Sequence, residues 1–333
     1  MRLGLVGTGR IGAHHAATLC ALPEVDSLVV TDTDQARARA LAASLEIACA
    51  PDTESLFAAG LDGVVIAAAT AAHPELILRA VSAGVPVFCE KPVAADLTGT
   101  LAVISSLAGS TVPVQIGFQR RFDAGYTAAR EAVRRGELGW VHTVRATTMD
   151  PAPPPAAYVP TSGGFFRDCG VHDFDAIRWV TGREVAEVYA VGANRGADFF
   201  RAAGDVDTAA ALLTLDDGTL GLVSGTRYNA AGYDVRLEVL GSLGDVVAGL
   251  DDRVPLRSAE PGVTWPAGPP CPGFLERFRA AYQAELAVFV DVAAGRVPSP
   301  CTVSDALAAF YVAEACELSR REHRPVALGE VRR

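Results

Sequence analysis

The feature that most constrains the fold is a glycine-rich turn at the start of the chain. A short apolar run, Arg2-Leu-Gly-Leu-Val6, leads into Gly7-Thr-Gly-Arg-Ile-Gly12, and an alanine-rich helical pattern follows. This order of strand, glycine turn and helix is typical of a dinucleotide-binding sheet. Gly7 permits the tight turn, Gly9 lets a pyrophosphate approach the backbone, and Gly12 lets the helix pack against the strand.

An acidic residue follows this turn at the spacing that a ribose requires. The second apolar run, Ser27-Leu-Val-Val-Thr31, ends in Asp32, twenty residues beyond Gly12. Its carboxylate can accept hydrogen bonds from ribose hydroxyls and would repel a 2′-phosphate. We therefore predict NAD rather than NADP, although Arg37 and Arg39 lie just downstream. The cofactor-binding residues predicted from this region are Gly7, Gly9, Arg10, Ile11, Gly12 and Asp32.

The alternation of strands and helices continues to about residue 119. Further apolar strand patterns cover 63–67, 85–89 and 112–116, and helical patterns cover 34–45, 74–83 and 97–107. This rhythm predicts an α/β Rossmann domain, a doubly wound parallel sheet, over residues 1–119.

One predicted strand leads into Glu90-Lys91-Pro92, at the carboxyl edge of the sheet, where ligands of such folds bind. A lysine there can place a positive charge near a developing alkoxide, but a surface lysine after a strand is an equally good interpretation. His73 begins a helix beside the same edge. For it we favour helix capping or a place in the cofactor wall over proton transfer.

The pattern changes after Gln119. Strand-like runs follow one another without intervening helices, at 140–148, 186–194, 206–215, 219–228, 233–241 and 244–249. Consecutive strands of this kind predict an α+β domain over residues 120–333 with a large, mostly antiparallel open sheet. Two helices, at about 274–294 and 303–320, complete it, and residues 325–328 can add an edge strand.

The second half contains a stretch, 163–179, with closely spaced titratable side chains. If the part after Arg167 is helical, Asp168, His172 and Asp175 fall within about a 60° arc of one face. An imidazole between two carboxylates is suited to proton transfer. The alternative is a solvated polar face of a helix.

Composition limits the possible partners and compartment. The formal charge of −10 argues against nucleic acid or an anionic membrane as a main partner, and no stretch is apolar enough to predict a membrane span. The seven cysteines are scattered without metal-ligand spacing, so we predict reduced thiols in a cytoplasmic protein without a bound metal.

With these motifs in view, the chain resembles the Gfo/Idh/MocA oxidoreductase family over nearly its whole length, and within it the inositol 2-dehydrogenases. The motifs that carry the resemblance are Gly7–Gly12, Ala83–Pro92, Gly117–Asp123, Ser162–Asp175 and Gly232-Tyr-Asp234. The chain departs from the family pattern at Ala68-Ala69, Gln119 and Cys169.

The resemblance implies a set of site residues. It implies Lys91, Asp168 and His172 as catalytic residues. For a polyol site it implies Arg121, Asp175 and Tyr233. It adds Thr70, His73, Glu90 and Lys91 to the cofactor site.

The predicted reaction is NAD-dependent oxidation of a secondary alcohol of a cyclic polyol, myo-inositol to 2-keto-inositol, with His172 as general base. The alternative within the family is a dehydrogenase or ketoreductase for a sugar or sugar derivative. A remote alternative is a non-catalytic NAD-binding regulator. Because an open sheet needs its second face covered, we also predict a homo-oligomer, either a dimer or a tetramer.

Overall fold

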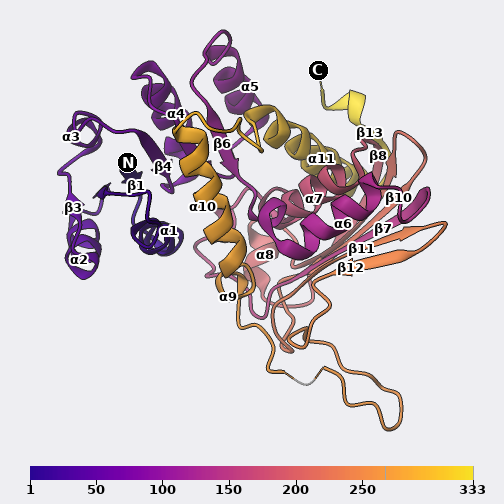
Figure 1. Cartoon of the computed structure of the whole chain (residues 1–333). Helices are drawn as coiled ribbons and strands as arrows, with labels where there is room; N and C mark the ends of the chain where they lie inside the picture. Colours follow the sequence, from indigo (N-terminus) through magenta and orange to yellow (C-terminus); the bar gives the residue numbers. More distant parts are fainter. Residues whose placement is uncertain (267, 333) are drawn as a thin grey trace. The chain divides into compact units, whose positions relative to one another are not determined.

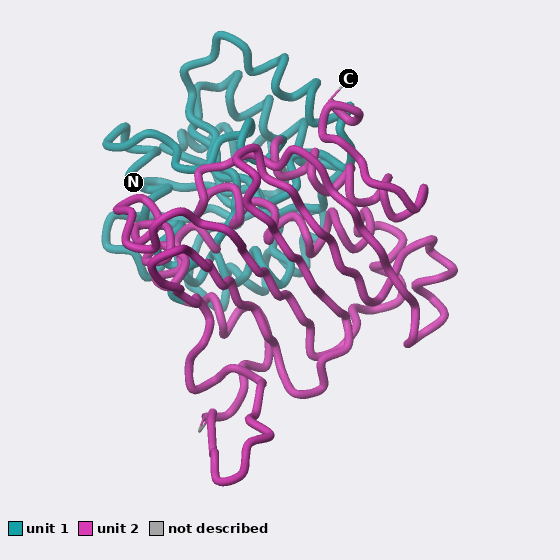
Figure 2. Tube along the Cα trace, turned by 90° about the vertical axis from the view of Figure 1, so that its right-hand side faces the viewer, with its two compact units in different colours: residues 1–119, 280–307 teal, residues 120–279, 308–333 magenta. Residues whose placement is uncertain are grey.

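The computed structural model of the chain contains two compact units, coloured separately in Figure 2. The first comprises residues 1–119 and 280–307, and the second comprises residues 120–279 and 308–333. The structure describes residues 1–266 and 268–332.

The first unit is built on a parallel sheet of six strands. The strands are β1 (Arg2–Val6), β2 (Ser27–Thr31), β3 (Ala48–Cys49), β4 (Gly63–Ile66), β5 (Val87–Glu90) and β6 (Val114–Gly117). They lie in the order β3-β2-β1-β4-β5-β6, and every neighbouring pair is parallel. This is the strand order of a Rossmann fold, so the prediction of a doubly wound sheet is confirmed.

Helices follow the strands of this unit. They are α1 (Arg10–Cys20), α2 (Gln35–Leu45), α3 (Thr53–Phe57), α4 (His73–Ser82) and α5 (Leu97–Ser106). Three of them begin after an aspartate, Asp34, Asp52 or Asp96, whose carboxylate accepts a backbone N–H of the first turn. Such caps satisfy donors that would otherwise have no partner inside the helix.

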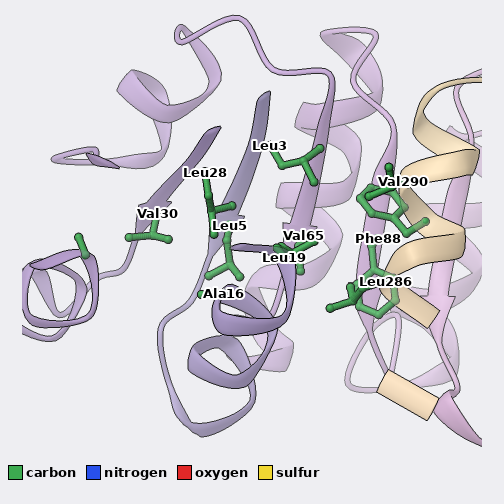
Figure 3. Close-up of a cluster of buried hydrophobic side chains, with 12 residues drawn as sticks. Leu3, Leu5, Ala16, Leu19, Leu28, Val30, Val65, Phe88, Leu286 and Val290 are labelled. Carbon is green, nitrogen blue, oxygen red and sulfur yellow. The ribbon is translucent and has the colours of Figure 1, made fainter. Parts of the chain in front are cut away.

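A late segment of the chain completes the core of the first unit. Leu286, Phe289 and Val290 of α10 (Arg279–Ala293) pack with Phe88 of β5 and the side chains of β1 (Figure 3). Beyond α10, Cys301 C=O accepts the backbone N–H of Ile116 at 2.9 Å. Residues 280–307 therefore join the first unit, outside the range 1–119 that the sequence predicts for it.

The second unit is built on a sheet of seven strands. These are β7 (Val141–Met149), β8 (Val185–Ala193), β9 (Thr208–Leu215), β10 (Leu220–Thr226), β11 (Asp234–Gly241), β12 (Asp245–Ala248) and β13 (Val326–Ala327). Their order is β12-β11-β7-β10-β9-β8-β13. Every pairing is antiparallel except that of β7 with β10, so the predicted mostly antiparallel sheet is confirmed.

In the described part of the chain, helices cover one face of this sheet and leave the other open. Figure 1 shows α6 (Ala124–Arg134), α7 (Val171–Thr181) and α11 (Val303–Glu322) on the same side of the strands. The opposite face presents large apolar side chains that are 40–45% exposed: Tyr189, Val191, Leu212, Leu220 and Leu222. Two short helices, α8 (Asp198–Ala202) and α9 (Phe274–Arg277), complete the unit.

No helix among the described residues is long and apolar enough to cross a membrane. The predicted long loop 251–272 contains neither helix nor strand among its described residues, and residue 267 lies outside them.

Candidate active site

The predicted cofactor-binding residues gather at one edge of the parallel sheet. Gly7 follows β1, Asp32 follows β2, Thr70 begins the 3-10 turn η1 (Thr70–Ala72) after β4, and Lys91 follows β5. These four strands are consecutive in the sheet, in the order β2-β1-β4-β5. Because carboxyl ends of parallel strands meet at one edge, the four segments lie along a single edge of the sheet, where ligands of such folds bind.

Steric restrictions at the glycine turn explain why glycine is required at two of its positions. Gly7 has φ +96°, and a Cβ there would lie 2.5 Å from the carbonyl oxygen of Ala67. A Cβ on Gly12 would lie 1.9 Å from the carbonyl oxygen of Gly7, so only glycine allows α1 to begin this close to β1. At Gly9, the N-cap of α1, a Cβ would meet nothing within 4 Å.

The first turn of α1, which contains Arg10 and Ile11, directly follows Gly9. Helix N-termini carry partial positive charge and bind phosphate groups. The residues present fit the pyrophosphate of NAD.

Asp32 is held as a carboxylate beside this turn. It is 8% exposed and accepts hydrogen bonds from Thr8 N at 2.6 Å, Asp34 N at 2.8 Å and Arg37 Nη2 at 2.8 Å. Burial raises its pKa, but these hydrogen bonds outweigh burial and lower the pKa of Asp32 to about 2. The group at the predicted ribose position is therefore ionised at neutral pH.

Two buried histidines contact the residues on either side of Lys91. The ring of His73 contacts Pro92 O through Nδ1 at 2.7 Å and Ala68 O through Nε2 at 3.0 Å. It thereby ties the turn after β5 to the turn after β4, and its place in the cofactor wall stays a prediction. His15 Nε2 contacts Glu90 Oε1 at 2.7 Å, immediately before Lys91.

In the second unit, Asp168 lies on a π-helical turn, η4 (Phe166–Gly170), and α7 begins only at Val171. The prediction of one continuous α-helix after Arg167 is therefore wrong at its first turn. A π-helical turn has more residues than an α-helical turn, so the 60° arc does not extend back to Asp168. Single π turns are frequent at functional sites.

Side chains from elsewhere in the second unit contact both oxygens of Asp168. Tyr158 Oη donates to Oδ1 at 3.0 Å, and Arg227 Nη2 donates to Oδ2 at 2.7 Å. The other terminal nitrogen of Arg227, Nη1, donates to Asp150 Oδ2 at 2.9 Å. Cys169 Sγ lies 3.8 Å from the same Asp150 oxygen, so the residue that departs from the family pattern borders this network.

Two buried ion pairs fix α7. Arg120 donates to Asp173 and to Thr148, and Arg121 donates to both oxygens of Asp175 at 2.9 and 2.6 Å. The four charged residues are between 1% and 7% exposed. Consecutive arginines therefore hold the helix that carries His172 in a fixed position within the second unit.

Tyr233, the remaining residue predicted for the polyol site, is 7% exposed and directly precedes β11. Burial raises its pKa well above the ordinary range, so its hydroxyl is protonated at neutral pH. The roles of Arg121, Asp175 and Tyr233 in substrate binding stay predictions.

Comparison with known proteins identifies the family. A model described as "Oxidoreductase family, NAD-binding Rossmann fold" matches residues 1–118, and the "GFO/IDH/MocA C-terminal domain" matches residues 126–247. The myo-inositol dehydrogenase Hyg17 of Streptomyces leeuwenhoekii is 41% identical over 322 residues, which cover 96% of this chain and 97% of the relative. The chain belongs to the Gfo/Idh/MocA oxidoreductase family.

Solved structures of Gfo/Idh/MocA proteins share the fold. A probable dehydrogenase from Thermotoga maritima has a TM-score of 0.93 and 34% identity, covering 99% of this chain and 100% of its own. A scyllo-inositol dehydrogenase from Lactobacillus casei with bound NAD(H) and scyllo-inositol has a TM-score of 0.87 and 28% identity, covering 99% of each chain. The protein is therefore an oxidoreductase with an NAD-binding Rossmann domain.

In this Gfo/Idh/MocA protein, sequence reasoning missed three residues around Asp168: Asp150, Tyr158 and Arg227. Asp150 and Tyr158 flank residues 151–157, a proline-rich loop, and Arg227 lies inside the predicted strand 219–228. An arginine in an otherwise uncharged strand was the available signal, because a buried arginine needs a carboxylate partner.

Proposed function

We propose that the protein oxidises a secondary alcohol of a cyclic polyol with NAD, converting myo-inositol to 2-keto-inositol. The observation that carries this proposal is the 41% identity to a myo-inositol dehydrogenase across nearly the whole of both chains. The myo-inositol 2-dehydrogenase of Thermotoga maritima, at 35% identity over 337 residues, supports the same substrate class.

In the proposed mechanism, His172 is the general base that removes the hydroxyl proton. Asp168 orients the imidazole or accepts a hydrogen bond from the same or a neighbouring hydroxyl. Lys91 places a positive charge near the alkoxide-like oxygen as the C–H and O–H bonds break and the carbonyl forms. When bound, NAD supplies the acceptor for the two electrons and the hydrogen of the carbinol carbon.

A panel of myo-inositol, scyllo-inositol, glucose and xylose, each with NAD or NADP, tests the substrate class by the NADH or NADPH formed. The expected result is the highest kcat/KM with myo-inositol and NAD. A higher value with an aldose would replace the proposal with the sugar dehydrogenase of the same family.

We propose NAD as the preferred cofactor because of the ionised Asp32. Asp32→Ala removes the charge that repels a 2′-phosphate and frees Arg37 Nη2, which is 2.8 Å from Asp32 Oδ1. The ratio of kcat/KM for NADP to that for NAD is expected to rise at least tenfold, about 1.4 kcal/mol. Steady-state kinetics with both cofactors measure it.

The matched control for this substitution is Asp32→Ala combined with Arg37→Ala. If Arg37 binds the 2′-phosphate, the second substitution should remove most of the gain with NADP. An unchanged cofactor ratio in Asp32→Ala would contradict the role of Asp32.

We also propose that the open face of the seven-stranded sheet pairs with a second copy of the chain. Leu212 and Leu222 are opposite each other on β9 and β10 and are 45% and 42% exposed. Replacing both by glutamate should reduce the mass measured by light scattering to that of a monomer, because two buried like charges oppose association. Leu101→Glu, on α5 and 38% exposed, is the control that should leave the mass unchanged. A monomeric parent at micromolar concentration would refute the proposal.

A further inference from the structure

Arg227 is a buried arginine that directly follows β10, and its contacts join three parts of the second unit. The residue is 5% exposed. Its guanidinium donates to Asp168 at 2.7 Å and to Asp150 at 2.9 Å, and it lies over the ring of Phe165, 5.4 Å from the centroid. An arginine in such a place needs carboxylate partners, and Arg227 has two.

The sheet fixes the position of two of these charged residues. β7 and β10 are parallel, with Thr226 opposite Met149, so Asp150 and Arg227 are the next residues on adjacent strands. The backbone N–H of Asp150 donates to Thr226 O at 2.9 Å, and that of Arg227 donates to Asp207 O at 2.8 Å. Asp168, on the π-helical turn, is the partner that lies outside the sheet. Arg227 therefore connects this turn to the seven-stranded sheet.

Four titratable groups around Asp168 have opposing effects on its charge. Arg227 favours the carboxylate, whereas Asp150 and the thiol of Cys169 add negative charge or a potential negative charge nearby. Tyr158 Oη donates to the other oxygen from the proline-rich loop. Burial opposes the charge of Arg227, but Cys169, Asp168 and Asp150 outweigh burial and raise the pKa of Arg227. The arginine is a permanent cation at hydrogen-bond distance from Asp168.

We propose that Arg227 is a positioning residue that holds the Asp168 carboxylate ionised and in one orientation for proton transfer at His172. This inference rests on the proposed function, in which Asp168 serves the general base. A protonated Asp168 would lack the negative charge that stabilises the imidazolium formed when His172 takes the proton, and a rotating Asp168 would not hold the imidazole or a substrate hydroxyl in one place.

A purely structural ion pair is the competing explanation, and Asp150 separates the two. Arg227→Gln removes the cation beside Asp168, so the pKa of Asp168 should rise. Asp150→Asn also breaks a contact of Arg227, but it removes a negative charge, so the pKa of Asp168 should not rise. Arg227→Lys keeps the positive charge but loses the planar guanidinium, whose two terminal nitrogens donate to Asp150 and to Asp168.

The experiment uses the full chain labelled with ¹³C at the aspartate carboxyl carbons, with Asp168→Asn to assign the Asp168 signal. The titration of that signal is followed by NMR in the parent, Arg227→Gln, Arg227→Lys and Asp150→Asn. We expect the Asp168 midpoint to rise by at least one pH unit in Arg227→Gln only. With polyol and NAD, kcat of Arg227→Gln should fall about 10–100-fold with little change in the KM for NAD, as a displaced catalytic group predicts.

An unchanged Asp168 titration in Arg227→Gln would overturn the proposal, as would a parent-like kcat. An equal fall of kcat in Asp150→Asn without any titration difference would also overturn it, in favour of a structural role. If the parent oxidises no polyol, the proposed function fails. The titration then decides for or against the role of Arg227 by itself, so the two failures are distinguishable.

Discussion

Replacing His172 by alanine is expected to lower kcat for polyol oxidation by about 10²–10⁴-fold, the usual effect of removing a general base. His172 lies in the first turn of α7, four residues after Asp168 in the chain. The dissociation constant of NADH, measured by fluorescence titration, should not change, because the predicted cofactor residues lie in the first unit.

His142→Ala is the control for this substitution. His142 is an exposed histidine on β7 of the same unit, so its removal tests for nonspecific effects of losing an imidazole. Its kcat should equal that of the parent. Full turnover in His172→Ala would exclude His172 as the base.

Replacing Asp173 by asparagine is expected to destabilise the protein by about 3–5 kcal/mol. Asp173 is 1% exposed and accepts hydrogen bonds from Arg120, itself 2% exposed, and from Thr148. The substitution leaves the Arg120 charge buried without its partner, which costs far more than loss of an exposed pair. The free energy of unfolding from urea titration measures the effect.

The matched comparison is Glu131→Gln, which removes an exposed pair of the same chemical type. Glu131 accepts from Arg134 at 2.9 Å, and the two side chains are 36% and 62% exposed. Its loss should cost less than about 1 kcal/mol. Equal effects of the two substitutions would show that burial of the Arg120–Asp173 pair does not determine its contribution.

The parts of the molecule that depend on local sequence were predictable. Gly7 and Gly12 occupy positions where a Cβ would collide with the backbone, so the motif determines the turn by sterics alone. Asp32 follows β2 because the apolar run ends there. The strands of the second sheet were predictable from their length and spacing.

The parts that depend on contacts distant in sequence were not predictable. The packing of Leu286 and Val290 into the first sheet depends on how a late helix returns to it, which no local pattern records. Likewise, Arg227 meets Asp150 because β10 pairs in parallel with β7, and that register is long-range information. The elements β3 and α3, with 2 and 5 residues, are too short for a periodic pattern to reveal.

The most direct test of the central claim is the fate of the hydrogen on the carbinol carbon of the substrate. The parent is incubated with NAD and myo-inositol deuterated at C2, and the reduced cofactor and the organic product are examined by mass spectrometry. The proposed function predicts one deuterium in each reduced cofactor molecule and 2-keto-inositol in equal amount. Reduced cofactor without deuterium, or no reduced cofactor at any substrate concentration, would contradict it.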